Sequence, residues 1–182
     1  MTVQQLLDMT SGVTFNEDYF TPGSHMQKLG YATAWGGRGG QPDWPQTIWE
    51  LVLELTERER EHGEVFNYRS IETDVLGYVV ERVTEQPLAE IVSDIVWQKL
   101  GAEEDGAYTV DRGGFALADG GFNATLRDYG RFGQMLADNG RAGDAEIAPA
   151  DWIEETRFGS GGQFGGIHAE ILPDGGYHNG FW

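Results

Sequence analysis

Two hydroxyl-bearing side chains lie close together in residues 66–77, where Tyr68 ends a short extended run and Ser70 follows it. The pKa of a phenol is about 10 in water, and a nearby cation would lower that value enough to make the phenolate a usable base. The pair could therefore be aimed into a cleft for proton transfer. The structural alternative is that Tyr68 is a half-buried aromatic residue whose hydroxyl binds a backbone carbonyl.

A helix is predicted directly behind this pair, and it would hold Tyr68 and Ser70 in place. Acidic and hydroxyl side chains open it, where they can cap free N–H groups and suit the helix dipole. Its apolar residues recur on one side, which predicts a single buried stripe. The expected capping residues are Glu72, Thr73 and Asp74, and the expected stripe is Val75, Leu76, Val79, Val80 and Val83.

The remaining elements are expected to be mainly helical. Helices are predicted over residues 2–9 (with Thr2 and Gln5 as a capping box), 45–61, 88–100 (ending at Gly101) and 149–156. Residues 14–41 are expected to be irregular, as a functional loop or as a surface loop pinned by its aromatics. Short strands are expected over 108–110 and 115–118 around a turn at 112–114, and a hairpin over 167–172 and 177–182.

A further helix is predicted from Thr125, with Asp128 in its first turn, to Asn139, where Gly140 ends it. Its expected inward face is Leu126, Tyr129, Gly133 and Leu136. The glycine-rich residues 158–166 contain no Gly-Lys-Ser/Thr and are expected to be flexible without binding phosphate.

Composition limits the classes of function. A hydrophobic content of 40% supports a packed core, and cysteine is absent, so disulfides and cysteine metal sites are excluded. The net charge of −18 argues against a nucleic acid as partner. No stretch reads as a signal peptide or a membrane span, which leaves a periplasmic or a cytoplasmic location open. The histidines are scattered and predict no metal site, and no cofactor is expected.

The string around Tyr68 resembles the second motif, Tyr-x-Asn, of the penicillin-recognising serine hydrolases, which include class C β-lactamases, DD-peptidases and related esterases. The esterases and 6-aminohexanoate-dimer hydrolases are similar but often carry serine at the third place, as Ser70 does. Residues 6–12 and 120–128 also resemble segments of that family. The resemblance implies that Tyr68 acts with a lysine on the proton of a nucleophilic serine, while Ser70 hydrogen-bonds within the site.

Two other motifs of that family are missing. None of the serines (Ser11, Ser24, Ser70, Ser93 and Ser160) has lysine three residues on, and no lysine-containing third motif is present. The segment His178-Asn179-Gly180 resembles an earlier strand more than that third motif. By the resemblance, residues 1–182 are expected to form a partial domain of α+β class: the helical subdomain and sheet edge of the β-lactamase/transpeptidase-like fold. Exposed apolar surface and self-association are then expected.

Three hypotheses follow. The first is a fragment of a serine hydrolase that acts on a small ester or amide through an acyl-enzyme, and that is inactive alone because it lacks the nucleophile. The second is a non-catalytic scaffold or binding module derived from the same fold. The third is an unrelated acidic helical enzyme that uses histidine and carboxylates, which a loss of activity on Tyr68→Phe would contradict.

Overall fold

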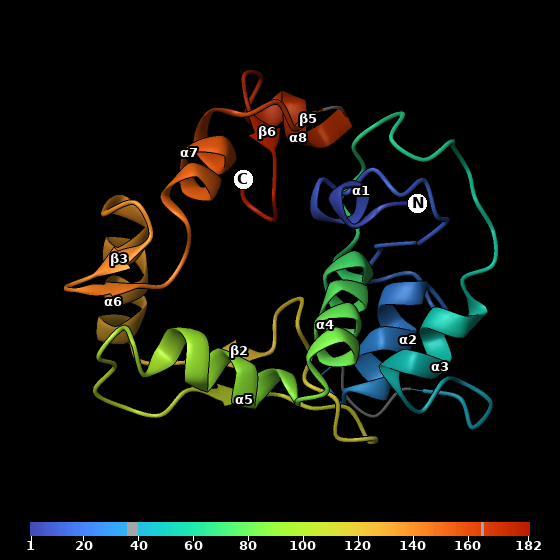
Figure 1. Ribbon diagram of the computed structural model, residues 1–182. Coiled ribbons are helices and arrows are strands. Elements are labelled where there is room, and N and C mark those ends of the chain that lie inside the picture. The colour runs from blue at the N-terminus through green and yellow to red at the C-terminus, as the bar shows by residue number, and fades with distance from the viewer. Residues whose placement is uncertain (36–39, 165) are drawn as a thin grey trace.

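The computed structural model describes residues 1–35, 40–164 and 166–182. Helices predominate, and Figure 1 shows them following one another in an arc that returns from the last strands to the first helix. The helices are α1 (Val3–Leu7), α2 (His25–Ala32), α3 (Ile48–Glu54), α4 (Ser70–Thr84), α5 (Leu88–Val92), the π-helical turn η1 (Ser93–Trp97), α6 (Leu126–Ala137), α7 (Ala150–Phe158) and α8 (Gly166–Ile171).

The strands in the described residues are short and form antiparallel pairs. These are β1 (Ala107–Tyr108) with β2 (Phe122–Asn123), β3 (Arg141–Ala142) with β4 (Ala145–Glu146), and β5 (Gly162–Gln163) with β6 (Gly176–Tyr177). The chain is thus mainly helical with small sheets, as the sequence predicted.

The main core lies where α2, α3 and the start of α4 meet the segment before β2. Ile48 and Leu51 of α3 and Ile71 of α4 are almost fully buried there. The other buried members are Phe15, Met26, Leu29, Phe115 and Leu117. Burial of such side chains stabilises a fold by about 1.5–3 kcal/mol each, so this cluster fixes the start of α4 on α2 and α3.

The buried face of α4 differs from the prediction. Val83, which ends the expected apolar stripe, is 74% exposed, whereas Glu72 and Asp74 are buried. Neither acid caps the helix, since Arg69 is the N-cap residue and makes no side-chain capping bond. Burial of these carboxylates is possible because distant parts of the chain supply hydrogen-bond donors, which a local apolar pattern does not reveal.

Two segments adopt a different secondary structure from the one expected. The predicted irregular loop contains α2, which begins where the Ser24 hydroxyl accepts a hydrogen bond from the N–H of Gln27 over 3.1 Å. The predicted strand over 167–172 is replaced by α8, and β6 pairs with β5 instead. The predicted helix over 45–61 ends at Glu54, after which the chain pairs with residues 12–14.

The helix predicted over 88–100 is interrupted by η1, whose wider turn is closed by a bond from the N–H of Gln98 to the carbonyl of Ser93 over 3.0 Å. A π-helical turn changes the side of the helix on which its residues lie. Ile95 is accordingly 50% exposed, although a buried position was expected. Gly101, with a φ of +65°, ends this region as predicted.

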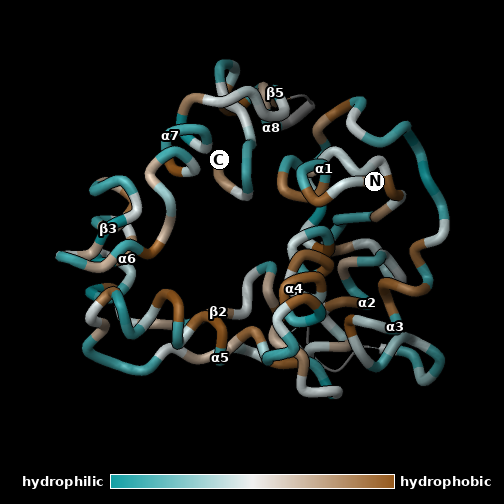
Figure 2. Tube along the Cα trace, in the orientation of Figure 1, coloured by the Kyte–Doolittle hydropathy of each residue, from teal (hydrophilic) through white to brown (hydrophobic). Residues whose placement is uncertain are grey.

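The capping prediction for α6 is confirmed, since the hydroxyl of Thr125 accepts a hydrogen bond from the N–H of Asp128. Its predicted inward face is wrong, because Leu126 is 89% exposed while Asp128 and Met135 are buried. Figure 2 shows hydrophobic residues along the Cα traces of α4 and α5. In the part of the chain that the structure describes, no helix combines the length and apolarity needed to cross a membrane.

Candidate functional site

Tyr68 and Ser70 are brought together at the start of α4. Both line a small hollow of about 130 Å³, whose walls come from α2, from the chain before it and from the segment before β2. The other lining residues are Tyr19, Met26, Leu29, Thr33, Trp35, Leu117, Asp119 and Gly120. The hydroxyl-bearing residues Tyr19, Thr33 and Ser70 and the carboxyl group of Asp119 thus share the hollow with Tyr68. The rest of its wall is aromatic and aliphatic.

Glu17 holds Ser70 through two hydrogen bonds. The N–H of Ser70 donates to Oε2 of Glu17 over 3.1 Å, and the Ser70 hydroxyl donates to Oε1. Burial raises the pKa of Glu17, while the bonds from Ser70 and the positive charge of Arg69 offset part of that rise. Sequence reasoning missed Glu17, although it lies among the aromatics of the long segment before α2.

The phenol of Tyr68 is not activated by a cation among the described residues. Burial raises its pKa, the Ser70 hydroxyl offsets part of that rise, and the charges of Glu17 and Asp119 add to it. The guanidinium of the adjacent Arg69 is directed elsewhere, to the carbonyl of Asn67 over 2.9 Å and to Glu59. The lowering of the phenol's pKa that a nearby cation would cause is therefore not found among the described residues.

The other side of Tyr68 is covered by aromatic residues from the far end of the chain. Its ring stacks on Trp182 with centroids 5.1 Å apart, and the Tyr177 ring lies edge-on to it with centroids 6.2 Å apart. Tyr177 is buried in a cluster with Met9 and Phe66. The extended run that carries Tyr68 is thus held between α1 and β6, a relationship that local sequence patterns did not predict.

Asp119 is placed by a buried carboxylate of α4. Oδ1 of Asp74 accepts hydrogen bonds from the N–H groups of Ala118 over 2.8 Å and of Asp119 over 3.3 Å. Burial and the charge of Glu17 raise the pKa of Asp119 to about 6. Burial and the charge of Asp119 raise the pKa of Asp74 well above its usual range. The hollow therefore lies beside carboxyl groups that hold protons more tightly than they would in water.

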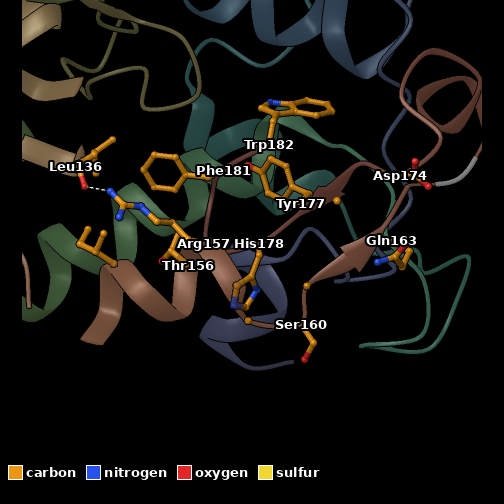
Figure 3. Close-up of a pocket in the computed structure, with 14 residues that line it drawn as sticks. Leu136, Thr156, Arg157, Ser160, Gln163, Asp174, Tyr177, His178, Phe181 and Trp182 are labelled. Atoms are coloured by element: carbon orange, nitrogen blue, oxygen red, sulfur yellow. Dashed lines mark hydrogen bonds between the residues drawn. The ribbon is translucent and has the colours of Figure 1, made fainter. Parts of the chain in front are cut away.

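His178 lies apart from Tyr68 and serves to join elements. Its Nδ1 is 2.7 Å from Oδ1 of Asp8 and its Nε2 is 2.7 Å from Oε1 of Glu155. Figure 3 shows it beside Ser160, where both residues line a larger hollow of about 690 Å³. The segment beginning at His178 thus links the end of α1 to α7.

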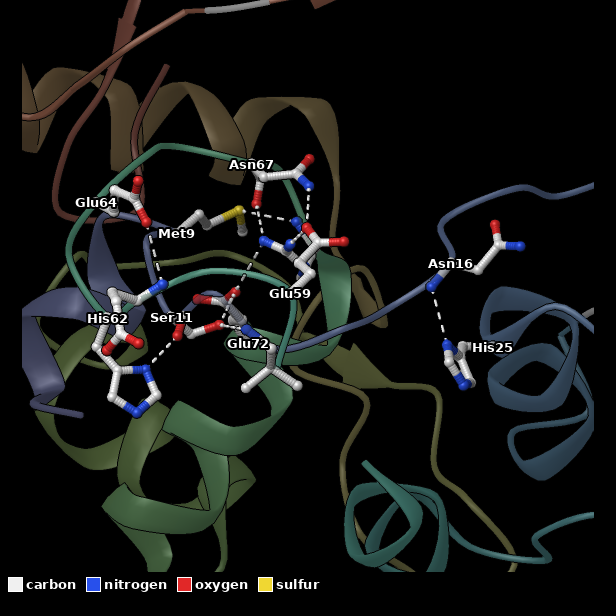
Figure 4. Close-up of polar contacts among 12 residues, drawn as sticks. Met9, Ser11, Asn16, His25, Glu59, His62, Glu64, Asn67 and Glu72 are labelled. Atoms are coloured by element: carbon white, nitrogen blue, oxygen red, sulfur yellow. Dashed lines mark hydrogen bonds and ion pairs between the residues drawn. The ribbon is translucent and has the colours of Figure 1, made fainter. Parts of the chain in front are cut away.

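A second polar cluster lies behind the site, between α1 and α4 (Figure 4). The Ser11 hydroxyl donates to Oε1 of Glu72 over 2.6 Å, and a ring nitrogen of His62 contacts the carbonyl of Ser11. Arg69 is almost fully buried next to Glu72, with 3.8 Å between Nη1 and Oε1. Among the described residues, no group of three or more histidine, aspartate or glutamate side chains is placed to hold a metal ion.

Comparison with known families assigns the chain to a protein class. Residues 1–175 match the sequence model of the family described as Beta-lactamase, and the chain belongs to that family. It is 35% identical to the 6-aminohexanoate-dimer hydrolase of Paenarthrobacter ureafaciens over an alignment of 185 positions, which covers 100% of this chain and 46% of that protein. The predicted resemblance is therefore confirmed, and the chain spans less than half the length of this curated relative.

Solved structures agree with this assignment. A putative 6-aminohexanoate-dimer hydrolase from Bacillus anthracis superposes with a TM-score of 0.80 at 30% identity, over 98% of this chain and 46% of its own. A D-stereospecific amidohydrolase from Streptomyces sp. gives a TM-score of 0.66 at 20% identity, over 99% and 56%, and supports the fold alone. The fold is thus part of the β-lactamase/transpeptidase-like fold, as predicted.

Proposed function

We propose that this chain is the middle part of a serine hydrolase that cleaves a small amide or ester substrate through an acyl-enzyme. Tyr68 is its proton-transfer residue, and the Ser70 hydroxyl makes hydrogen bonds within the site. The observation that carries the proposal is the convergence of Tyr68 and Ser70 on one hollow at the start of α4. Amide substrates are favoured because two similar proteins, at 35% and 30% identity, are named 6-aminohexanoate-dimer hydrolases.

The raised pKa of Tyr68 specifies what the rest of the site must supply. A neutral phenol is a weak proton acceptor, so a lysine ammonium beside it is required to make it a usable base. Both that lysine and the nucleophilic serine are proposed to come from sequence outside this chain, since no Ser-x-x-Lys occurs within it. The chain alone should then form no acyl-enzyme.

The alternative is a non-catalytic scaffold or binding module that retains this part of the fold. The absence of Ser-x-x-Lys and the lack of a cation at Tyr68 within the described residues favour it over an independent enzyme. The hollow would then bind a ligand without transforming it.

The test compares this chain with the protein encoded when the reading frame is extended in both directions in the source DNA. Release of p-nitroaniline from aminoacyl anilides and of p-nitrophenol from acetate and butyrate esters would be followed for both. The proposal expects turnover only from the extended protein, and loss of it on Tyr68→Phe. Stop codons directly flanking residues 1–182, or full activity of extended Tyr68→Phe, would contradict it and favour the scaffold.

A further inference from the structure

A groove of about 640 Å³ lies between α3, the C-terminal end of α4 and the turn at 112–114. Among the described residues it shares no lining residue with the hollow at Tyr68, so the two are separate. Pockets of about 300–1,000 Å³ are typical of sites that take a small molecule, so this groove has room for a long side chain. We call it the α3–α4 groove, and its chemistry is set by Trp49, Tyr78, Glu81, Glu85, Asp111 and Phe115.

Three aromatic rings line the groove together. Tyr78 of α4 stacks on Phe115 with ring centroids 3.6 Å apart, and the ring of Trp49 meets Tyr78 edge-on with centroids 5.1 Å apart. Phe115 is buried, whereas Trp49 is 49% exposed. The face of an aromatic ring carries partial negative charge and attracts cations, and tryptophan does so most strongly. The groove therefore presents an exposed indole, held by the rings behind it, to a positively charged group.

Carboxylates border the same groove. Glu81 and Glu85 are four residues apart at the end of α4 and so lie on one side of it. Oε1 of Glu81 accepts the N–H of Leu88 over 2.7 Å, which fixes this carboxylate and leaves Oε2 for a further donor. Burial and the charge of Asp111 raise the pKa of Tyr78, so negative charge acts on the aromatic rings. The C-terminal end of α4, where the helix dipole favours a cation, adds to this potential.

The described part of the chain supplies no cation to this groove, since its described lining residues include no lysine, arginine or histidine. Arg112, in the turn that borders the groove, donates to Gln46 instead, and its Cζ lies 4.3 Å from the centroid of the Tyr31 ring. Arg82 of α4 is exposed and does not line the groove. The negative potential is therefore open to a cation from another molecule, and Arg112 shows that a guanidinium packs on an aromatic ring in this protein.

We propose that the α3–α4 groove binds an arginine side chain of a basic peptide segment in a partner protein. A guanidinium is planar, so it stacks on Trp49 while it donates paired hydrogen bonds to a carboxylate of Glu81 or Glu85. A lysine ammonium is attracted by the same charges but does not stack. The net charge of −18 steers a basic partner towards the protein. Binding at this groove requires no turnover and does not depend on the proposed function.

The first experiment is an NMR titration of this chain, carrying ¹⁵N-labelled tryptophan, with a blocked pentapeptide that has arginine between glycines. The indole signals of Trp49 and Trp152 would be assigned by Trp49→Phe and Trp152→Phe. Trp49 should shift and saturate, whereas Trp152, which is 40% exposed beside acidic residues of α7, should not. A lysine peptide should bind roughly two- to fivefold more weakly. The neutral citrulline peptide should cause no saturable shift.

The second experiment removes the carboxylates of the groove. Glu81→Gln combined with Glu85→Gln keeps the acceptor for the Leu88 N–H and should weaken arginine-peptide binding by roughly three- to tenfold. Glu90→Gln combined with Glu154→Gln removes the same charge from exposed positions elsewhere and should leave the affinity unchanged. Equal losses in the two double variants, equal shifts of Trp49 and Trp152, or equal binding of the citrulline peptide would overturn the proposal, because each would mean unspecific attraction to an acidic surface.

The same signal distinguishes the other possible occupants of the groove. A Trp49 shift that depends on protein concentration without peptide would show that a second copy covers the groove. Loss of peptide binding in the extended protein would show that the rest of its own chain covers it. Either result would overturn a partner protein as the occupant. Retained binding in the extended protein would support it, whether or not that protein shows turnover.

Discussion

The hydroxyl of Ser11 donates to Oε1 of Glu72 over 2.6 Å, and both side chains are buried. This bond joins the turn after α1 to the first turn of α4, directly behind the pair formed by Tyr68 and Ser70. Oε2 of Glu72 has no hydrogen-bond partner within the described residues. A buried carboxylate with an unsatisfied oxygen is costly when charged, which makes this contact sensitive to pH.

The first prediction is that Glu72 makes the protein more stable in mild acid. Burial raises its pKa to about 7 from 4.5, against the opposing effects of the Ser11 bond and the Arg69 charge. The folded state therefore holds a proton that the unfolded state releases between those values. At 1.36 kcal/mol per unit, about 3 kcal/mol of stability, present below pH 4.5, should be lost as the pH rises through 7.

Urea unfolding of the wild type and of Glu72→Gln at pH 5 and pH 8 measures this effect. Glutamine keeps the acceptor for Ser11 but cannot ionise, so the variant should lose much less stability between the two values. Glu154→Gln serves as the exposed control. An equally steep pH dependence in Glu72→Gln would show that Asp74 or Asp119 carries the effect, because burial raises their pKa values in the same direction.

The second prediction concerns Asp111, whose carboxylate organises the predicted turn at 112–114. It accepts from the N–H groups of Ile48 over 2.9 Å, of Gly113 over 2.8 Å and of Phe115 over 3.0 Å. Asp111→Ala would leave buried donors unpaired and should destabilise the fold by about 3 kcal/mol. Chemical denaturation should show this loss, with Asp111→Asn intermediate and the exposed Asp105→Ala near wild type. A loss in Asp111→Ala no larger than in Asp105→Ala would contradict it.

The third prediction is that His178 stabilises the contact between α1 and α7 most strongly when its imidazole is protonated. Burial lowers its pKa, but its hydrogen bonds to Glu155 and Asp8 and the charges of these residues raise it further, so the net change is upward. The stabilisation should be complete below the usual histidine pKa near 6.5 and lost as the pH rises through the folded value. His178→Ala should therefore lower Tm by roughly 3 °C at pH 6 and by less at pH 9.

Thermal unfolding of His178→Ala, Asp8→Asn and their double variant at both pH values isolates the pair. The two substitutions should be less than additive at pH 6 and nearly additive at pH 9. Equal effects of His178→Ala at both pH values would mean that the imidazole stabilises the fold by packing alone.

The fourth prediction is self-association through exposed apolar side chains. Leu126 is 89% exposed, Phe158 79% and Trp182 64%. Apolar groups of this size associate in water, whereas the net charge of −18 opposes close approach. Sedimentation velocity should therefore show oligomers that increase with added salt, and Phe158→Ser with Leu126→Ser should reduce them. A monomer at all protein and salt concentrations would contradict the prediction.

The sequence predicted those features that are decided within a few residues. The capping box at Thr2, the N-cap at Thr125 and the turn around Gly113 are all present, because their donors and acceptors are near neighbours in the chain. The family could also be assigned from the sequence, since the string around Tyr68 is itself a local pattern. Of the candidate site, Tyr68 and Ser70 line one hollow, and their roles stay predictions.

The remaining features depend on partners far along the chain. Glu72 and Asp74 were expected to cap α4 at its surface, but Ser11 and the backbone at Ala118 make their burial favourable. Glu17 was missed because its partner, Ser70, is 53 residues away. The error in α8 has a different cause, since a short apolar run is compatible with both a helix and a strand.

The contacts that close the arc span almost the whole chain. Gln4 donates to the side chain of Asn179 over 2.8 Å at a separation of 175 residues, next to the contacts that His178 makes with Asp8 and Glu155. Closing a flexible loop of that length costs about 4–5 kcal/mol of chain entropy. These contacts should therefore form late in folding and slow it. During synthesis, Gln4 of α1 can therefore make this contact only after the segment that follows β6 has been made.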